Sequence, residues 1–154
     1  MVRRAESSGF SAENPILILI AEDDFSHAEA VRRGLRDASV RIVHVSDGEK
    51  AMEYLLHQGE FADLASSPKP DLVLLDLRLP KMDGIEVRQR MSATMGLRQI
   101  PTVMLSTSAA SRDIDLAYDA GVVSYLVKPM NFDEFKQLIE AFKTFWLKWN
   151  VFAP

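Results

Sequence analysis

Short apolar runs alternate along the chain with segments in which apolar residues recur at helical spacing. The runs are short enough to be buried strands of a parallel sheet, and there are five, at 16–21, 40–45, 71–76, 101–106 and 122–127. Between the first two, Ala28, Val31 and Leu35 lie three and four residues apart, which is typical of one helix face. This strict alternation predicts an α/β fold with a doubly wound parallel sheet, and right-handed crossovers place helices on both of its faces.

Breaker and cap residues mark the other boundaries. Serine and proline are frequent at 59–70, which predicts a loop there, and the last helix is expected to start near Asn131 and to run to about Trp149. The expected organisation is a flexible leader at 1–14, a single domain at 15–150 and a short tail at 151–154, with no output domain after it.

Composition restricts the class of protein. The chain has 154 residues, of which 47% are hydrophobic and 26% are charged, as in an ordinary globular domain. Its net charge of -4 gives no basic field for nucleic acid, and no apolar stretch is long enough to span a bilayer. The absence of cysteine excludes disulfides and is compatible with a reducing cytosol. We therefore expect a cytoplasmic protein that binds neither nucleic acid nor membranes.

Polar side chains stand where the predicted strands end. Asp76 ends the third run, Glu22-Asp23-Asp24 follow the first, Ser106 ends the fourth and Lys128 follows the fifth. In an open α/β sheet the carboxyl ends of the strands form one edge, and ligands bind there. We therefore expect these residues to converge on one site.

The chemistry of such a site follows from its charges. Several carboxylates in one crevice repel each other, so a bound cation is expected, and a set of oxygen ligands favours Mg²⁺. Asp76 can then attack phosphorus and become an acyl phosphate. Lys128 supplies a positive charge for the phosphoryl oxygens, and Ser106 supplies a hydroxyl that can hydrogen-bond one of them.

Each residue alone also has a simpler explanation. Asp24 is equally well explained as the cap of the following helix, Lys128-Pro129 as a turn, and Ser106 as an ordinary strand-end hydroxyl. The occurrence of all these groups in order at four strand ends favours a functional site. The three histidines share no metal-binding spacing, and we interpret them as ordinary surface or half-buried residues: His27, His44 and His57.

These residues together resemble the receiver domain of two-component response regulators. The resemblance covers about residues 15–145 and rests on Glu22-Asp23-Asp24, on Asp-Leu-Arg-Leu-Pro-Lys-Met-Asp-Gly at 76–84, on Ser106 and on Lys128-Pro129. It implies a flavodoxin-like fold with five helices and a five-stranded sheet in the order 2-1-3-4-5.

The resemblance also implies a role for each site residue. Asp76 would be the phosphoacceptor, Lys128 would pair with the phosphoryl oxygens, Ser106 would be the switch hydroxyl, and Tyr125 would turn inward when Ser106 moves toward the phosphate. For Mg²⁺, it implies Asp24, Asp76 and the backbone carbonyl of Arg78 as direct ligands, and Asp23 as a ligand through water.

The function implied is phosphorelay signalling. The chain would take its phosphoryl group from a phosphohistidine of a sensor histidine kinase, and it would not be a conventional enzyme, although it promotes its own phosphorylation and slow dephosphorylation. A narrower resemblance to stand-alone regulators that partner with phytochrome-type kinases rests on the loop 59–70, on Leu105-Ser106-Thr107-Ser108 and on Phe145-Trp146-Leu147.

The last helix carries more aromatic residues than one buried stripe requires. Five of the eight phenylalanines and both tryptophans lie after residue 131. Large exposed aromatic patches usually mark partner surfaces, so we expect a homodimer built on residues 131–154. The alternative is that these residues only cover the sheet.

Three other functions match parts of this pattern. A hydrolase with an aspartyl-phosphate intermediate of the haloacid-dehalogenase kind resembles this pattern but has an acid two residues after the nucleophile, where Arg78 cannot donate a proton. A flavin or nucleotide carrier needs a phosphate-binding loop after the first strand, where three carboxylates stand instead. A phosphate-independent binding module is expected to lose an acid, the acceptor or the lysine, and all are present.

Overall fold

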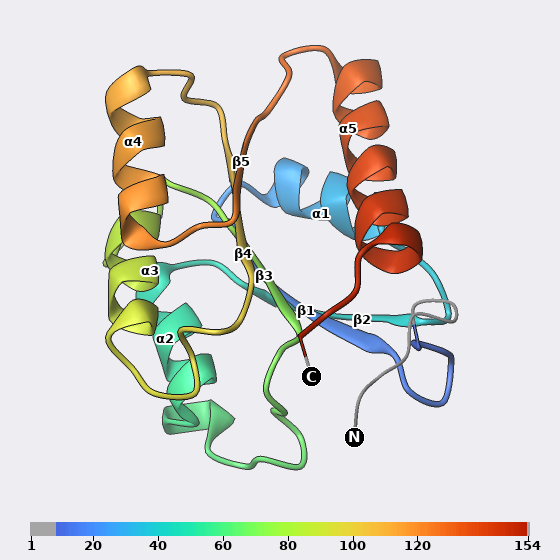
Figure 1. The fold of residues 1–154 in the computed structure, drawn as a ribbon, viewed down its shortest axis with the longest axis vertical. Coiled ribbons are helices and arrows are strands. Elements are labelled where there is room, and N and C mark those ends of the chain that lie inside the picture. The colour runs from blue at the N-terminus through green and yellow to red at the C-terminus, as the bar shows by residue number, and fades with distance from the viewer. Residues whose placement is uncertain (1–8, 154) are drawn as a thin grey trace.

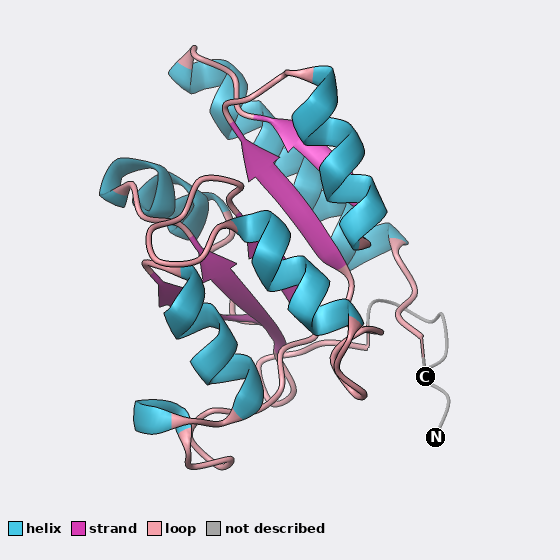
Figure 2. Cartoon of the chain, turned by 90° about the vertical axis from the view of Figure 1, so that its left-hand side faces the viewer, coloured by secondary structure: helices cyan, strands magenta, loops and turns pink. Residues whose placement is uncertain are grey.

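The computed structural model describes residues 9–153 and shows one parallel sheet between two layers of helices (Figures 1 and 2). The sheet has five strands in the order β2-β1-β3-β4-β5, so the predicted fold class and strand order are confirmed. The strands are β1 (Ile16–Ala21), β2 (Val40–Val45), β3 (Leu72–Leu75), β4 (Thr102–Ser106) and β5 (Ser124–Val127).

The helices follow the strands one by one, as the alternation predicts. They are α1 (Phe25–Gly34), α2 (Gly48–Leu56), α3 (Gly84–Ser92), α4 (Ser111–Ala120) and α5 (Phe132–Thr144). A 3₁₀ turn, η1 (Gly59–Phe61), opens the loop after α2, and a π-helical turn, η2 (Phe145–Trp149), extends α5. Figure 1 shows α1 and α5 on one face of the sheet and α2, α3 and α4 on the other.

Side chains alternate between the two faces of each strand, so the sheet separates two apolar cores. Leu19 of β1 and Leu75 of β3 pack on the side of α2, α3 and α4. Ile18 and Leu74 belong to the other core, which α1 and α5 cover. Both faces of the central strands are therefore buried, which explains why their sequences are apolar without interruption.

Side-chain caps fix where the helices begin. Asp47 accepts a hydrogen bond from Lys50 N at the start of α2, and Asp83 accepts one from Glu86 N at the start of α3. Asn131, the expected start of the last helix, caps α5 by accepting from Glu134 N. Each cap satisfies one backbone N–H that the first helical turn leaves without a partner.

Both ends of the described chain meet beside the last helix. The ring of Phe152 packs edge-on against Phe10 at 5.4 Å and lies 5.7 Å from the ring of Trp146. The expected leader falls partly outside the described residues, since the structure begins at residue 9. Among the residues that it describes, no helix is long and apolar enough to cross a membrane.

Candidate functional site

The carboxyl edge of the sheet brings three carboxylates together. Asp76 comes directly after β3, where its backbone N–H donates to Ala21 O at 2.9 Å, and Glu22 and Asp23 come directly after β1. One carboxylate oxygen from each of Glu22, Asp23 and Asp76 lies within 4.8 Å of the other two. Glu22 and Asp76 are buried, whereas Asp23 is exposed, so the cluster opens to solvent on one side.

A buried lysine neutralises part of this charge. The Nζ atom of Lys128 lies 2.5 Å from Glu22 Oε2 and 3.0 Å from Asp76 Oδ2. The backbone N–H of Lys128 donates to Ser106 O at 2.7 Å, which fixes the end of β5 against the end of β4. The predicted convergence of Asp76, Ser106 and Lys128 on one edge is therefore what the fold produces.

The pKa of Glu22 is raised to about 7 by its surroundings. Burial is the main cause, because it disfavours the charged carboxylate, and the nearby charge of Asp76 acts in the same direction. The hydrogen bond and the charge of Lys128 oppose both effects without cancelling them. Lys128 therefore offsets only part of the effect of burial on the pKa of Glu22.

Asp24 stands outside the cluster. Its side chain caps α1 by accepting from His27 N at 3.0 Å, and this hydrogen bond is the main reason why its pKa is lowered. The alternative explanation of Asp24 as a helix cap is confirmed. Asp24 is not among the three residues whose carboxylate oxygens lie within 4.8 Å of one another, and its expected role as a direct metal ligand stays a prediction.

The side chain of Arg78 is directed away from the acidic cluster. Its backbone N–H donates to Asp76 Oδ1 at 3.2 Å, whereas its exposed guanidinium pairs with Asp113 of α4 at 3.3 Å. Asp113 also accepts from the hydroxyl of Ser108 at 2.5 Å. The arginine therefore links the loop after β3 to the start of α4.

Ser106 and Tyr125 both bind the backbone of Ser108. Ser106 is buried at the end of β4, and its Oγ accepts from Ser108 N at 3.1 Å. Tyr125 of β5 donates from its hydroxyl to Ser108 O at 2.8 Å. Both predicted switch residues thus bind the same short segment, from its two sides.

Two contacts of the site are not evident from the sequence. The Nδ1 atom of His27 lies 3.1 Å from Lys128 Nζ, although we interpreted the histidine as an ordinary residue. Its position in the first turn after a strand-end acidic run was the available signal. Gly84 packs against the acceptor, since a Cβ at this position would lie 2.2 Å from Asp76 O.

Comparison with known proteins defines the class. The family model of the response regulator receiver domain matches residues 18–140, so the chain belongs to the response regulator receiver family. The chain is 42% identical over 142 residues to the regulatory protein FilR2 of Methanothrix harundinacea, an alignment that covers 90% of this chain and 88% of FilR2.

Two solved structures of response regulators, one of them from a phytochrome system, extend the comparison. The phosphorylated cyanobacterial phytochrome response regulator RcpA has a TM-score of 0.85 and 34% identity, with 91% of this chain and 99% of RcpA covered. The Mn²⁺-bound response regulator Rcp1 has a TM-score of 0.84 and 33% identity, with 91% of this chain and 100% of that chain covered. Rcp1 is a protein of Synechocystis.

Proposed function

We propose that this chain accepts a phosphoryl group on Asp76 from a phosphohistidine of a sensor histidine kinase. The observation that carries the proposal is the contact of Lys128 Nζ with Asp76 Oδ2 beside the carboxylates of Glu22 and Asp23. This arrangement combines a nucleophile, a cation for the transferred group and a set of oxygen ligands. The chain's membership of the receiver family supports it.

The residues present fit a divalent cation, and we propose Mg²⁺. All three clustered side chains offer carboxylate oxygen, the ligand type that Mg²⁺ prefers, and the Lys128 ammonium brings one positive charge to three carboxyl groups. Asp23 and Asp76 would bind the ion, with Glu22 beside them and the backbone carbonyl of Arg78 as a further ligand. The ion would neutralise charge on the transferred phosphoryl group.

In the transfer, a carboxylate oxygen of Asp76 forms a bond to phosphorus while the phosphorus–nitrogen bond of the phosphohistidine breaks. The bonding electrons stay with the departing imidazole, so no oxidant or further reactant is needed. Lys128 then exchanges its bond to the carboxylate for one to a phosphoryl oxygen, and Ser106 donates its hydroxyl to another.

The signal would leave the site through Ser108. When Ser106 moves toward the phosphoryl group, its Oγ gives up the N–H of Ser108, and of these two hydrogen bonds the Ser108 backbone keeps only the one from Tyr125. The start of α4 and the end of β5 would then shift, which alters the surface that a partner meets.

We propose a phytochrome-type kinase as the partner, because the solved relatives include the response regulator of a cyanobacterial phytochrome. A cytoplasmic location fits a chain without cysteine.

Kinase identity is tested by transfer of the phosphoryl group from the phosphorylated kinase of the same organism to wild-type protein and to Asp76→Asn. If the phytochrome-type kinase transfers its phosphoryl group to wild-type protein no faster than unrelated histidine kinases do, the proposal of this partner is wrong.

The first experiment measures intact mass after incubation with Mg²⁺ and acetyl phosphate. Wild type should gain one phosphoryl group that hydroxylamine removes, and Asp76→Asn should gain none. If neither protein gains mass while Mg²⁺ binds, the proposal is wrong. Steady turnover of a phosphate ester would instead favour the hydrolase alternative.

We further propose that the chain forms a homodimer through residues 131–154. Phe135, Ile139 and Phe142 are buried against the sheet, so they account for the packing of α5. Phe145 and Trp149, at the end of the same helix, are 51% and 68% exposed. This segment therefore carries more aromatic side chains than are needed to cover the sheet.

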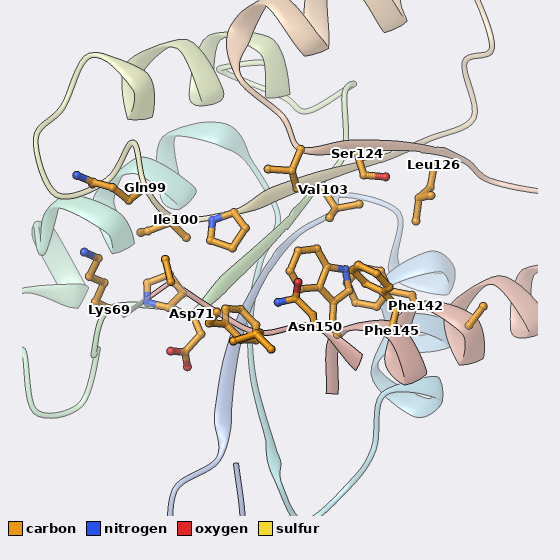
Figure 3. Close-up of a pocket in the computed structure, with 18 of the residues that line it drawn as sticks. Lys69, Asp71, Gln99, Ile100, Val103, Ser124, Leu126, Phe142, Phe145 and Asn150 are labelled. Carbon is orange, nitrogen blue, oxygen red and sulfur yellow. The ribbon is translucent and has the colours of Figure 1, made fainter. Parts of the chain in front are cut away.

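A hollow lies next to Phe145, which is one of its lining residues. It has a volume of about 970 Å³, and Figure 3 shows Phe142, Phe145 and Asn150 on one side of it and Ile100, Val103 and Ser124 on the other. A projecting apolar group beside an apolar hollow suits a two-fold interface, in which each copy fills the hollow of the other. We therefore assign a second copy of this chain as its occupant.

Light scattering at tens of micromolar, with and without phosphodonor, tests the dimer. Wild type should have twice the mass of the monomer, and the Trp149→Ala, Phe145→Ala double variant should be monomeric. Phe25→Ala is the matched control, because Phe25 is also exposed but lies on α1. A monomeric wild type would overturn this part of the proposal.

A further inference from the structure

His27 contacts the lysine of the proposed acceptor site. Its Nδ1 lies 3.1 Å from Lys128 Nζ, and its ring packs against Phe135 of α5 with 6.0 Å between ring centroids. Its backbone N–H binds Asp24, the cap of α1, and its Nε2 lies 3.9 Å from Asp24 Oδ2. The histidine is thus held from two sides with one ring nitrogen directed at the lysine.

The chemistry of the contact fixes the form of the ring. An ammonium has three hydrogen-bond donors and no acceptor, so Nδ1 of His27 must accept and Nε2 must carry the proton. Lys128 then has three acceptors for its three N–H groups: Asp76 Oδ2, Glu22 Oε2 and His27 Nδ1. The ammonium is fully hydrogen-bonded in a buried position, where an unmet donor would be costly.

These three acceptors have different fates in the proposed reaction, on which this inference rests. Asp76 becomes the acyl phosphate, so its bond to the lysine must pass to a phosphoryl oxygen. Glu22 belongs to the carboxylate group that would face the metal ion. Of the three, His27 takes no part in phosphoryl or metal chemistry and can keep its bond throughout.

We propose that His27 is a positioning residue that holds the Lys128 ammonium in place while the lysine exchanges the Asp76 carboxylate for the phosphoryl group. Phe135 supports this role, because the buried ring from α5 limits the orientations that the imidazole can take. The positioning therefore depends on the packing of α1 against α5 as well as on the strand ends.

The test compares two substitutions that separate hydrogen bonding from packing. His27→Leu keeps an apolar side chain against Phe135 but removes the acceptor, whereas His27→Gln keeps an acceptor. Glu29→Gln is the control on the same helix, since Glu29 pairs with Arg33 and makes no contact with Lys128. Each protein is phosphorylated with acetyl phosphate at saturating Mg²⁺, and the rate is followed by intact mass.

We expect His27→Leu to lower the rate about tenfold, as for the loss of a hydrogen bond to a charged group. His27→Gln should stay within about threefold of wild type and Glu29→Gln should be unchanged. The cross-peak of the ¹⁵N-labelled Lys128 ammonium, which a merely structural role of His27 would leave in place, should shift or disappear in His27→Leu.

Two results would overturn the inference. One is a wild-type rate together with an unchanged Lys128 cross-peak in His27→Leu, and the other is an equal loss of rate in the leucine and glutamine variants, which would assign His27 to packing. If wild type itself takes up no phosphate, the proposed function fails. The Lys128 cross-peak in the His27 variants still decides whether the histidine holds the lysine.

Discussion

Lys128 reaches Asp76 with its Nζ 3.0 Å from Oδ2, although 52 residues separate the two along the chain. The contact exists because β3 and β5 run parallel and end at the same edge of the sheet, with β4 between them. Both side chains are almost fully buried. Removal of one partner of such a buried pair destabilises the folded protein, because the other charge is left buried without an opposite charge beside it.

Lys128→Met should therefore destabilise the metal-free protein by about 3 kcal/mol. The methionine keeps most of the volume but leaves Glu22 and Asp76 without their cation. Urea unfolding well above pH 7 measures the effect, because Glu22 is ionised there in wild type and its pKa rises further when Lys128 is lost. Lys143→Met is the control, since Lys143 makes a more exposed pair with Asp37 and should change the free energy of unfolding by less than about 1 kcal/mol. Equal losses in the two variants would contradict the prediction.

The raised pKa of Glu22 predicts a dependence of stability on pH. Its folded value of about 7 exceeds its ordinary value of 4.5, so the folded state binds the proton more tightly. The resulting stabilisation is complete below pH 4.5 and is lost as the pH rises to about 7. Without Mg²⁺, wild type should lose free energy of unfolding relative to Glu22→Gln across this interval.

Urea unfolding of both proteins at several pH values checks this dependence. If the difference in free energy of unfolding between wild type and Glu22→Gln stays constant between pH 4.5 and about 7, Glu22 does not titrate in this interval. A cation favours the ionised carboxylate, so saturating Mg²⁺ should move the transition of wild type to lower pH. In Glu22→Gln the same addition should produce no such movement.

The sequence predicted the convergence of Asp76, Ser106 and Lys128 because alternation of strands and helices determines which residues end strands. It did not distinguish Glu22 from Asp24. Both are carboxylates in the short segment between β1 and α1, and a two-residue difference in the start of α1 decides which one caps the helix. Periodicity locates a helix but not its first residue.

The contact of His27 with Lys128 was not predicted for a different reason. Its partner Lys128 lies 101 residues away, and their contact depends on the rotation of α1 about its axis and on the packing of Phe135 behind the ring. Such details arise from packing between elements, whereas the sequence pattern describes each element alone.

Gly84 provides a test of how closely the acceptor strand is packed. A Cβ at this position would lie 2.2 Å from the backbone oxygen of Asp76, so Gly84→Ala must displace the acceptor or the start of α3. We expect a loss of about 2 kcal/mol in stability and slower phosphorylation by acetyl phosphate.

Gly96→Ala is the matched control for this substitution. A Cβ there meets nothing within 4 Å, although the φ of +88° is unfavourable for alanine. It should cost about 1 kcal/mol and leave the phosphorylation rate unchanged. A Gly84→Ala protein that is phosphorylated as fast as Gly96→Ala would show that the acceptor tolerates the displacement.

Tyr125→Phe should separate phosphorylation from its consequence. The substitution removes only the hydroxyl that donates to Ser108 O, and this hydroxyl is remote from the transfer chemistry in the proposed mechanism. We therefore expect the phosphorylation rate to stay within about twofold of wild type. The effect of phosphorylation on the dimer is the ratio of its dissociation constants with and without phosphodonor. In Tyr125→Phe this ratio should be about fivefold closer to one than in wild type, as expected for the loss of one hydrogen bond of about 1 kcal/mol.

Tyr54→Phe is a closely matched control for this prediction. The Tyr54 hydroxyl also donates to a backbone carbonyl at 2.8 Å, that of Pro68 in the loop before β3, but it contacts neither Ser108 nor α4. Sedimentation of the three proteins should show a wild-type ratio in Tyr54→Phe and a reduced ratio in Tyr125→Phe. If Tyr125→Phe retains the full ratio, the signal does not pass through Ser108, and the Arg78–Asp113 pair, which also joins the acceptor loop to α4, becomes the next route to test.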